Sequence, residues 1–126
     1  MSARSTWPAR MALLALAAVS TVGLAAESPR VIVFLAGGRS HGYGTHEHYG
    51  GCMLLARLLN ENAPGVRAVV HRGWPKDPAV AEGADAIVVC CDGGAHSVLG
   101  RHLEAVAKLV ERGAGLACFH YAVVET

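Results

Sequence analysis

Two uninterrupted apolar runs, residues 31–36 and 86–91, constrain the fold of this chain more than any other feature. Each run is rich in β-branched residues, has the length of a single strand, and is soon followed by a pair of glycines. A strand that is apolar at every position is typical of a parallel sheet whose two faces are both covered by helices. The sequence therefore predicts two central parallel strands.

The segments around these runs alternate between helical and extended patterns. Apolar residues recur at helical spacing over residues 51–62 and 99–112, and a short helical turn is expected at residues 79–82. Further strands are expected at residues 66–71 and 115–120. This alternation predicts an α/β fold with an open, mostly parallel sheet of flavodoxin-like type and helices on both faces. We expect the domain to be truncated after the fourth strand, with a small complete domain as the alternative.

The first 26 residues have the pattern of a secretory signal peptide. Arg4 and Arg10 precede an apolar run over residues 11–24, and the segment Gly23-Leu24-Ala25 matches a small-x-small cleavage site. Because the run is shorter than the ~20 residues of a transmembrane helix, a retained anchor is the less favoured alternative. We therefore expect an exported protein, periplasmic or extracellular, whose mature domain spans residues 27–126 and keeps no stable membrane span.

Charge and cysteine patterns exclude several classes of protein. Eleven Lys and Arg and ten Asp and Glu are scattered along the chain, so no basic patch for nucleic acid is expected. No nucleotide is expected either, because neither G-x-G-x-x-G nor Gly-Lys-Ser/Thr occurs after the first strand. The cysteines form no C-x-x-C pair, and we expect buried free thiols, with disulfides as the alternative that an oxidising compartment permits. They are Cys52, Cys90, Cys91 and Cys118.

Histidines cluster outside the carboxyl ends of the predicted strands, where open parallel sheets bind their ligands. His41, His46 and His48 lie in the polar segment 39–49 that follows the first strand. Imidazoles two residues apart on an extended loop can face the same way and bind a divalent metal such as zinc. A hydrated polar loop without metal is the alternative. Two more histidines near strand ends are His71 and His96.

Other strand-end residues are candidates for proton transfer or substrate contact. Asp92 follows the third strand and His120 ends the fourth, so both are candidates for acid–base catalysis. Their alternative roles are a turn cap and a structural histidine. Trp74 could stack on a sugar ring or cover the edge of the core. The glycine pairs could offer N–H groups to a polyhydroxy or anionic ligand, or form ordinary turns. They are Gly37 with Gly38 and Gly93 with Gly94.

Several short motifs, taken in order, resemble those of the ThuA-like (trehalose-utilisation) domain family. They are residues 31–37 followed by 40–42, then 46–48, 73–75, 84–88, 91–94 and 113–121. The resemblance spans nearly all of residues 31–125. It implies a fold like that of the class I glutamine amidotransferases, in which one strand ends in a nucleophile elbow bearing Cys. Here His120 holds the elbow position and Cys118 lies within the strand, so Cys-dependent amidotransferase chemistry is not expected.

The resemblance also implies a role in sugar catabolism, particularly on 3-keto-glycosides such as oxidised trehalose. An enzyme of this kind would be a hydrolase, lyase or isomerase acting on a small-molecule sugar or glycoside. His41, His46 and His48 would bind metal or substrate, and Asp92 and His120 would act as acid and base. The alternatives are a non-catalytic carbohydrate-binding or interaction module and an inactive fragment.

Overall fold

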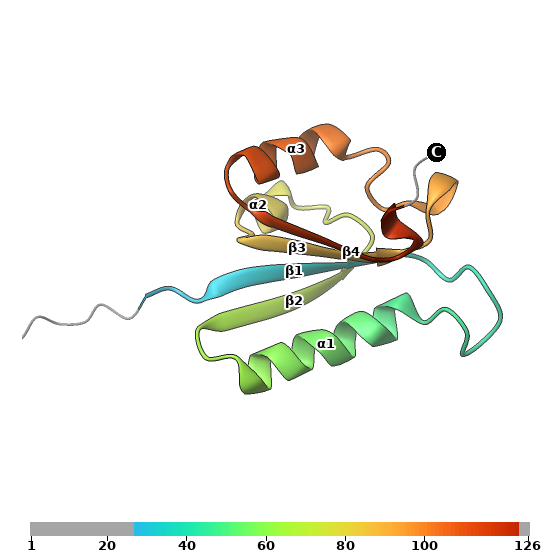
Figure 1. Ribbon diagram of the computed structural model, residues 1–126, viewed down its shortest axis with the longest axis horizontal. Helices are drawn as coiled ribbons and strands as arrows, with labels where there is room; N and C mark the ends of the chain where they lie inside the picture. The colour runs from blue at the N-terminus through green and yellow to red at the C-terminus, as the bar shows by residue number, and fades with distance from the viewer. Residues whose placement is uncertain (1–26, 124–126) are drawn as a thin grey trace, which may run out of the picture.

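Residues 27–123, which are those described by the computed structural model, form one open sheet with helices on both faces (Figure 1). The strands are β1 (Arg30–Ala36), β2 (Val66–Arg72), β3 (Ala86–Cys91) and β4 (Gly115–His120). All neighbouring strands are parallel, and their order is β2-β1-β3-β4. The predicted α/β fold with an open parallel sheet is confirmed. The predicted signal peptide, residues 1–26, lies outside the described residues.

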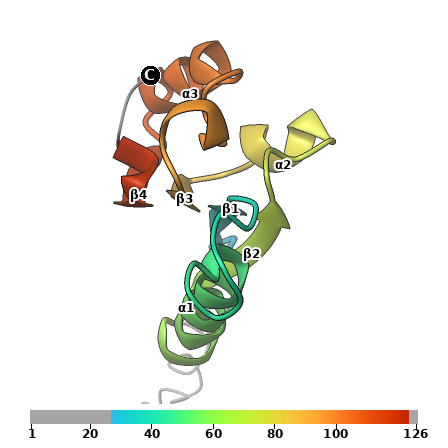
Figure 2. The same ribbon diagram turned by 90° about the vertical axis from the view of Figure 1, so that its right-hand side faces the viewer.

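The helices lie on opposite faces of the sheet. The helix α1 (His48–Asn62) covers one face, and α2 (Pro78–Glu82) and α3 (Leu103–Glu111) lie on the other, as Figures 1 and 2 show. Two short 3-10 turns, η1 (Gly94–His96) and η2 (Tyr121–Val123), follow β3 and β4. None of the helices within residues 27–123 is both long enough and apolar enough to cross a membrane.

The strand order creates a switch point between β1 and β3. The chain leaves β1 toward α1 and β2 on one side, and it leaves β3 toward α3 and β4 on the other. The connections after β1 and β3 therefore diverge at the carboxyl ends of two adjacent central strands. In sheets of this kind that point is where ligands bind.

The apolar runs are continuous because successive side chains of β1 and β3 enter two different cores. On the α1 side, Phe34 and Ala36 pack with residues of that helix and of β2. On the α3 side, Val33 and Leu35 pack with alternate residues of β3 and with both helices. The remaining buried members of these two clusters are Cys52, Ala56, Ala68, Ala81, Ala84, Ile87, Val89, Cys91, Leu99, Val106 and Leu109.

Two helix boundaries differ from those predicted. The first helix begins at His48 rather than at residue 51, so it includes Gly50 and Gly51 in its first turns. Glycine has low helix propensity, and the tertiary contacts of buried His48 and Cys52 outweigh it. The third helix covers Leu103–Glu111 rather than residues 99–112, because Leu99 is buried in a turn that precedes Gly100. The other predicted elements agree with the structure to within one residue at each end.

Candidate metal centre

Four histidines and one aspartate meet at the carboxyl edge of the sheet. Asp92 follows β3 directly, and its Oδ1 atom is the common neighbour of three imidazoles. The Nδ1 atoms of His120 and His46 lie 3.3 and 3.5 Å from this oxygen. The Nε2 atom of His48 lies 3.7 Å from it. One carboxylate is therefore approached by side chains from three segments, which are loop 37–47, the first turn of α1 and the end of β4.

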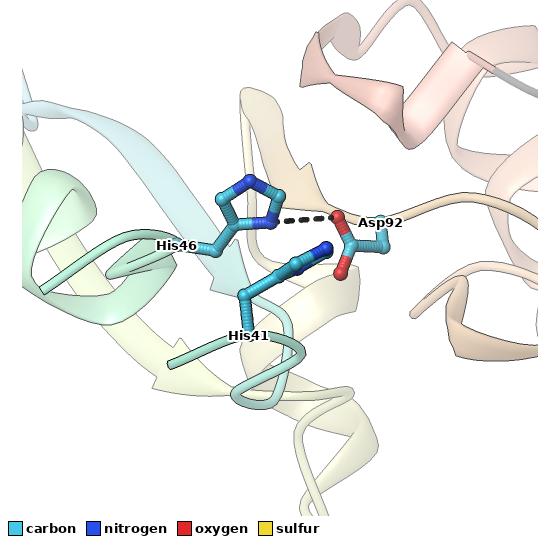
Figure 3. Close-up of side chains that lie close together, drawn as sticks. All are labelled: His41, His46 and Asp92. Atoms are coloured by element: carbon cyan, nitrogen blue, oxygen red, sulfur yellow. Dashed lines mark ion pairs between the residues drawn. The ribbon is translucent and has the colours of Figure 1, made fainter. Parts of the chain in front are cut away.

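These side chains form two overlapping groups with the spacing of metal ligands. His48, Asp92 and His120 form one group, and His41, His46 and Asp92 form the other. Within each group the candidate ligand atoms all lie within 4.8 Å of one another. Figure 3 shows how His41 and His46 approach Asp92 from the loop after β1. His48 is buried, His46 and Asp92 are partly buried, and His41 and His120 are exposed.

Two atoms at the centre of the cluster lack hydrogen-bond partners. His48 Nε2 and Asp92 Oδ1 are the buried side-chain polar atoms of residues 27–123 for which no partner exists. Leaving such groups unsatisfied typically costs about 1–3 kcal/mol each, so their presence needs an explanation. Ligand atoms about 2.0–2.2 Å from a tetrahedral zinc ion lie about 3.3 Å from each other. The distances around Asp92 Oδ1 are close to that value, so a cation among these side chains would satisfy both atoms.

Asp92 is held in the ionised form that a metal requires. A hydrogen bond from the Ser40 hydroxyl, followed by the charges of His48, His46 and His120, lowers the pKa of Asp92, and burial opposes this shift. Ser40 Oγ also lies 3.0 Å from His41 Nδ1 and 3.1 Å from His46 Nδ1. Ser40 therefore organises the group on the loop side. The sequence analysis did not identify it as a site residue, although it directly precedes His41 in a motif of the family resemblance.

The backbone at His120 is unusual and aims its ring at Asp92. His120 has a φ of 61° and is the non-glycine residue of positive φ within residues 27–123. This left-handed conformation is strained for a residue with a Cβ and is found most often at functional sites. It turns the chain sharply from β4 into η2, which is the shape of an elbow between a strand and a helix.

The ligand set differs from the one that spacing predicted. We expected His41, His46 and His48 to lie together on one loop, but His48 belongs to α1 and the three do not form a single group. The ring centroids of His46 and His48 are 5.8 Å apart. The groups are completed instead by Asp92 and His120, which were expected to act as acid and base. His71 and His96 belong to neither group among the described residues.

Gly37 is required by the close approach of the chain after β1 to β3. A Cβ atom at this position would lie 2.5 Å from Cys91 Cβ and 2.9 Å from Cys91 Cα. Its N–H donates to the Cys90 carbonyl at 2.8 Å, so this amide is already used and is not free for a ligand. Gly94 has a φ of 62°, which the turn into η1 requires. The expected ligand contacts of Gly38, Gly93 and Gly94 stay predictions.

Trp74 lies against the core on the face of the sheet that α2 and α3 cover. Its ring stacks on His102 with a centroid distance of 4.5 Å and an interplanar angle of 9°. It also packs against the core cluster beneath α2 and α3. One face of the ring is therefore covered, which favours a role in closing the core edge over stacking on a sugar. The ring borders a groove that is lined by α2 and α3 and includes none of the metal-group residues.

All four cysteines are free thiols. Burial raises the pKa of Cys52 to about 12 and also raises the pKa values of Cys90 and Cys118. A thiol with a raised pKa is a poor source of the thiolate that nucleophilic catalysis requires. Cys52, Cys90 and Cys118 are therefore poorly suited to act as nucleophiles.

No family model, curated protein or solved structure matches this chain. Its class is therefore defined by fold and site: an α/β domain with a parallel sheet and a histidine–aspartate cluster at the switch point.

Proposed function

We propose that His48, Asp92 and His120 bind one divalent metal ion, with zinc as the first candidate. The observation that carries the proposal is the pair of buried atoms, His48 Nε2 and Asp92 Oδ1, which face each other at 3.7 Å without hydrogen-bond partners. Two imidazole nitrogens and one carboxylate oxygen are a ligand set that zinc adopts in catalytic sites, where a further position stays open.

The second group of ligands is less suited to hold the ion. The Nδ1 atoms of His41 and His46 are both already in contact with Ser40 Oγ. The other group contains the buried His48, whose Nε2 atom has no other partner. We therefore assign the ion to His48, Asp92 and His120, and we assign His46 to the substrate side of the site.

We further propose that the domain is a ThuA-like protein acting on a small oxidised sugar such as a 3-keto-glycoside. A keto group acidifies the neighbouring C–H bond, so elimination or isomerisation requires an electrophile at the carbonyl and a base for the proton. The metal, when bound, would supply the electrophile. His46 would take the proton, because its side chain is partly exposed and its Nδ1 atom lies 3.1 Å from Ser40 Oγ, which orients the ring.

The test measures metal first and turnover second. Metal content by elemental analysis and zinc affinity by calorimetry are measured for the intact protein, for His48→Ala and His120→Ala, and for His71→Ala as a control outside both groups. We expect one zinc per chain in the parent protein and in His71→Ala, and loss of zinc in the other two. A folded parent protein that binds no divalent metal would overturn the metal assignment and leave a metal-free His120–Asp92 acid–base pair as the alternative.

The sugar assignment has its own test. Turnover of 3-keto-trehalose and of trehalose is followed with and without a chelator, in the parent protein and in His46→Ala. We expect the keto-sugar alone to react, and we expect both the chelator and His46→Ala to suppress the reaction. Zinc binding without any turnover of keto-glycosides would retain the metal site and remove the proposed substrate.

We also propose that the protein is exported, on the evidence of the pattern in residues 1–26. Amino-terminal sequencing of the mature protein checks this. Cleavage close to Ala25 or Ala26 is the expected result, and an intact amino terminus in a cytoplasmic fraction would contradict it.

A further inference from the structure

Cys90 lies directly behind the proposed metal centre. It is the penultimate residue of β3 and packs on the α1 face of the sheet. Its Sγ atom lies 3.6 Å from Nδ1 of His48, the first residue of α1. On the other side of the same ring, Nε2 faces Asp92 Oδ1. The His48 ring therefore spans the space between a thiol and a carboxylate.

The His48 ring has little freedom to find other partners. His48 is 5% exposed, and Cys90 Sγ is the hydrogen-bond partner of its Nδ1 atom in the described structure. Cys52, one helical turn further along α1, packs in the same core cluster as Cys90. The Cys90 thiol is thus packed against α1 near both His48 and Cys52.

We propose that Cys90 is a positioning residue that accepts the hydrogen of His48 Nδ1 and so leaves the lone pair of Nε2 facing Asp92. A neutral imidazole has one N–H and one acceptor nitrogen, so fixing the hydrogen on Nδ1 decides the role of Nε2. Histidines that bind metals almost always donate their other N–H to a neighbouring group, which orients the ring. A backbone carbonyl or carboxylate is the usual acceptor, and here the acceptor is sulfur.

The opposite tautomer is unsuited to a metal ligand. With the hydrogen on Nε2, an N–H faces Asp92 Oδ1 at 3.7 Å, which the charge of the carboxylate favours in the metal-free protein. Nε2 then has no lone pair to offer a cation. With the hydrogen on Nδ1, two acceptors face each other instead, which is the arrangement that a cation between them would stabilise.

The inference rests on the proposed metal site. Two measurements test it. The first is ¹⁵N NMR of the zinc-bound protein, which identifies the ring nitrogen of His48 that carries hydrogen. The second is zinc affinity by calorimetry. Both are applied to the parent protein, Cys90→Ala, Cys90→Ser and the control Cys118→Ala, whose thiol packs on the opposite face of the sheet.

The expected result is hydrogen on Nδ1 of zinc-bound His48 in the parent protein, in Cys90→Ser and in Cys118→Ala. Zinc affinity is expected to fall about 10- to 100-fold in Cys90→Ala and to stay within about twofold in Cys118→Ala. Zinc bound to His48 through Nδ1 in the parent protein would overturn the inference even if no variant folds. Unchanged zinc affinity in folded Cys90→Ala would overturn it and leave the metal site in place. A parent protein that binds no zinc would overturn the metal proposal and this inference together.

Discussion

The two aspartates at the ends of β3 occupy opposite environments. Asp85, at the amino end, accepts a hydrogen bond from Val31 N–H at 2.7 Å and another from Arg30 at 3.0 Å. Its backbone N–H donates to the Val31 carbonyl at 2.8 Å, and its carbonyl accepts from Gly115 at 2.9 Å. Asp92, at the carboxyl end, has an Oδ1 atom that is buried and has no hydrogen-bond partner.

The difference separates a structural carboxylate from a candidate functional one. The pKa of each is lowered, so ionisation alone does not distinguish them. The backbone N–H of Val31, followed by the Arg30 side chain, lowers the pKa of Asp85, and every one of these contacts fastens β3 to β1. Asp92 instead gathers histidines from three parts of the chain and keeps an acceptor atom unused. An unused buried acceptor is the more informative sign of a site.

The largest expected effect is on zinc binding when Asp92 is replaced. Asp92→Asn removes the charge of a proposed ligand, and we expect zinc affinity to fall at least about 100-fold. Loss of a residue that only supports a ligand typically lowers affinity about 10- to 100-fold, so loss of the ligand charge itself should have a larger effect. The thermal midpoint of the metal-free protein at neutral pH is expected to fall slightly, because the lowered pKa of Asp92 means that the folded protein favours its charged form. Calorimetry and circular dichroism measure the two quantities.

Asp85→Asn is the matched control for that experiment. It changes, in the same way, the aspartate that flanks the other end of β3, and we expect zinc affinity within about twofold of the parent value. Equal loss of zinc in both variants would mean that the site responds to general loosening of β3, and the contrast between the two ends would be lost.

A smaller effect, on stability, is expected when the close contact between the chain after β1 and the end of β3 is disturbed. In Gly37→Ala the new methyl group would lie 2.5 Å from Cys91 Cβ, so the backbone must shift. Overpacking of this kind costs about 1–3 kcal/mol in the free energy of unfolding, measured by urea denaturation. Gly38→Ala is the control, because nothing lies within 4 Å of its added Cβ. Equal stabilities of the two variants would show that β1 and β3 are not tightly apposed there.

The smallest effect concerns the response of Asp85 to acid. Because its pKa is lowered in the folded protein, the stability it contributes is fully present above about pH 4 and is lost as the pH falls through the folded pKa. We therefore expect Asp85→Asn to have a lower thermal midpoint than the parent protein at neutral pH and a weaker decline in acid. Thermal melts across that pH range measure this, and parallel curves for the two proteins would contradict it.

The sequence predicted the strands best, because apolar runs with clear boundaries fit only a buried strand. The runs over Ala86–Cys91 and Gly115–His120 are bounded by glycine or by polar residues, and both strands were predicted with the bounds that the structure has. The start of α1 was predicted at residue 51 rather than at His48, because Gly50 and Gly51 have low helix propensity and the helix is maintained there by buried contacts. Local propensity is a weak guide where tertiary packing decides.

The site was predictable in its location but not in its grouping. Since the carboxyl ends of parallel strands meet at one edge, the histidines and Asp92 were expected near each other. Which of them form a group with the spacing of metal ligands depends on features without a sequence pattern, such as the left-handed backbone of His120 and the inclusion of His48 in α1. The thiol behind His48 was not identified for the same reason, because Cys90 and His48 meet only through packing of α1 on the sheet.

The central claim is that Asp92 shares a metal ion with His48 and His120, and a crystal of the intact protein soaked in zinc tests it most directly. An anomalous difference map locates the ion without assumptions about affinity. We predict one strong peak about 2.0–2.2 Å from His48 Nε2, His120 Nδ1 and a carboxylate oxygen of Asp92. No peak at this position in a zinc-soaked crystal, or a peak held by other residues, would contradict the account.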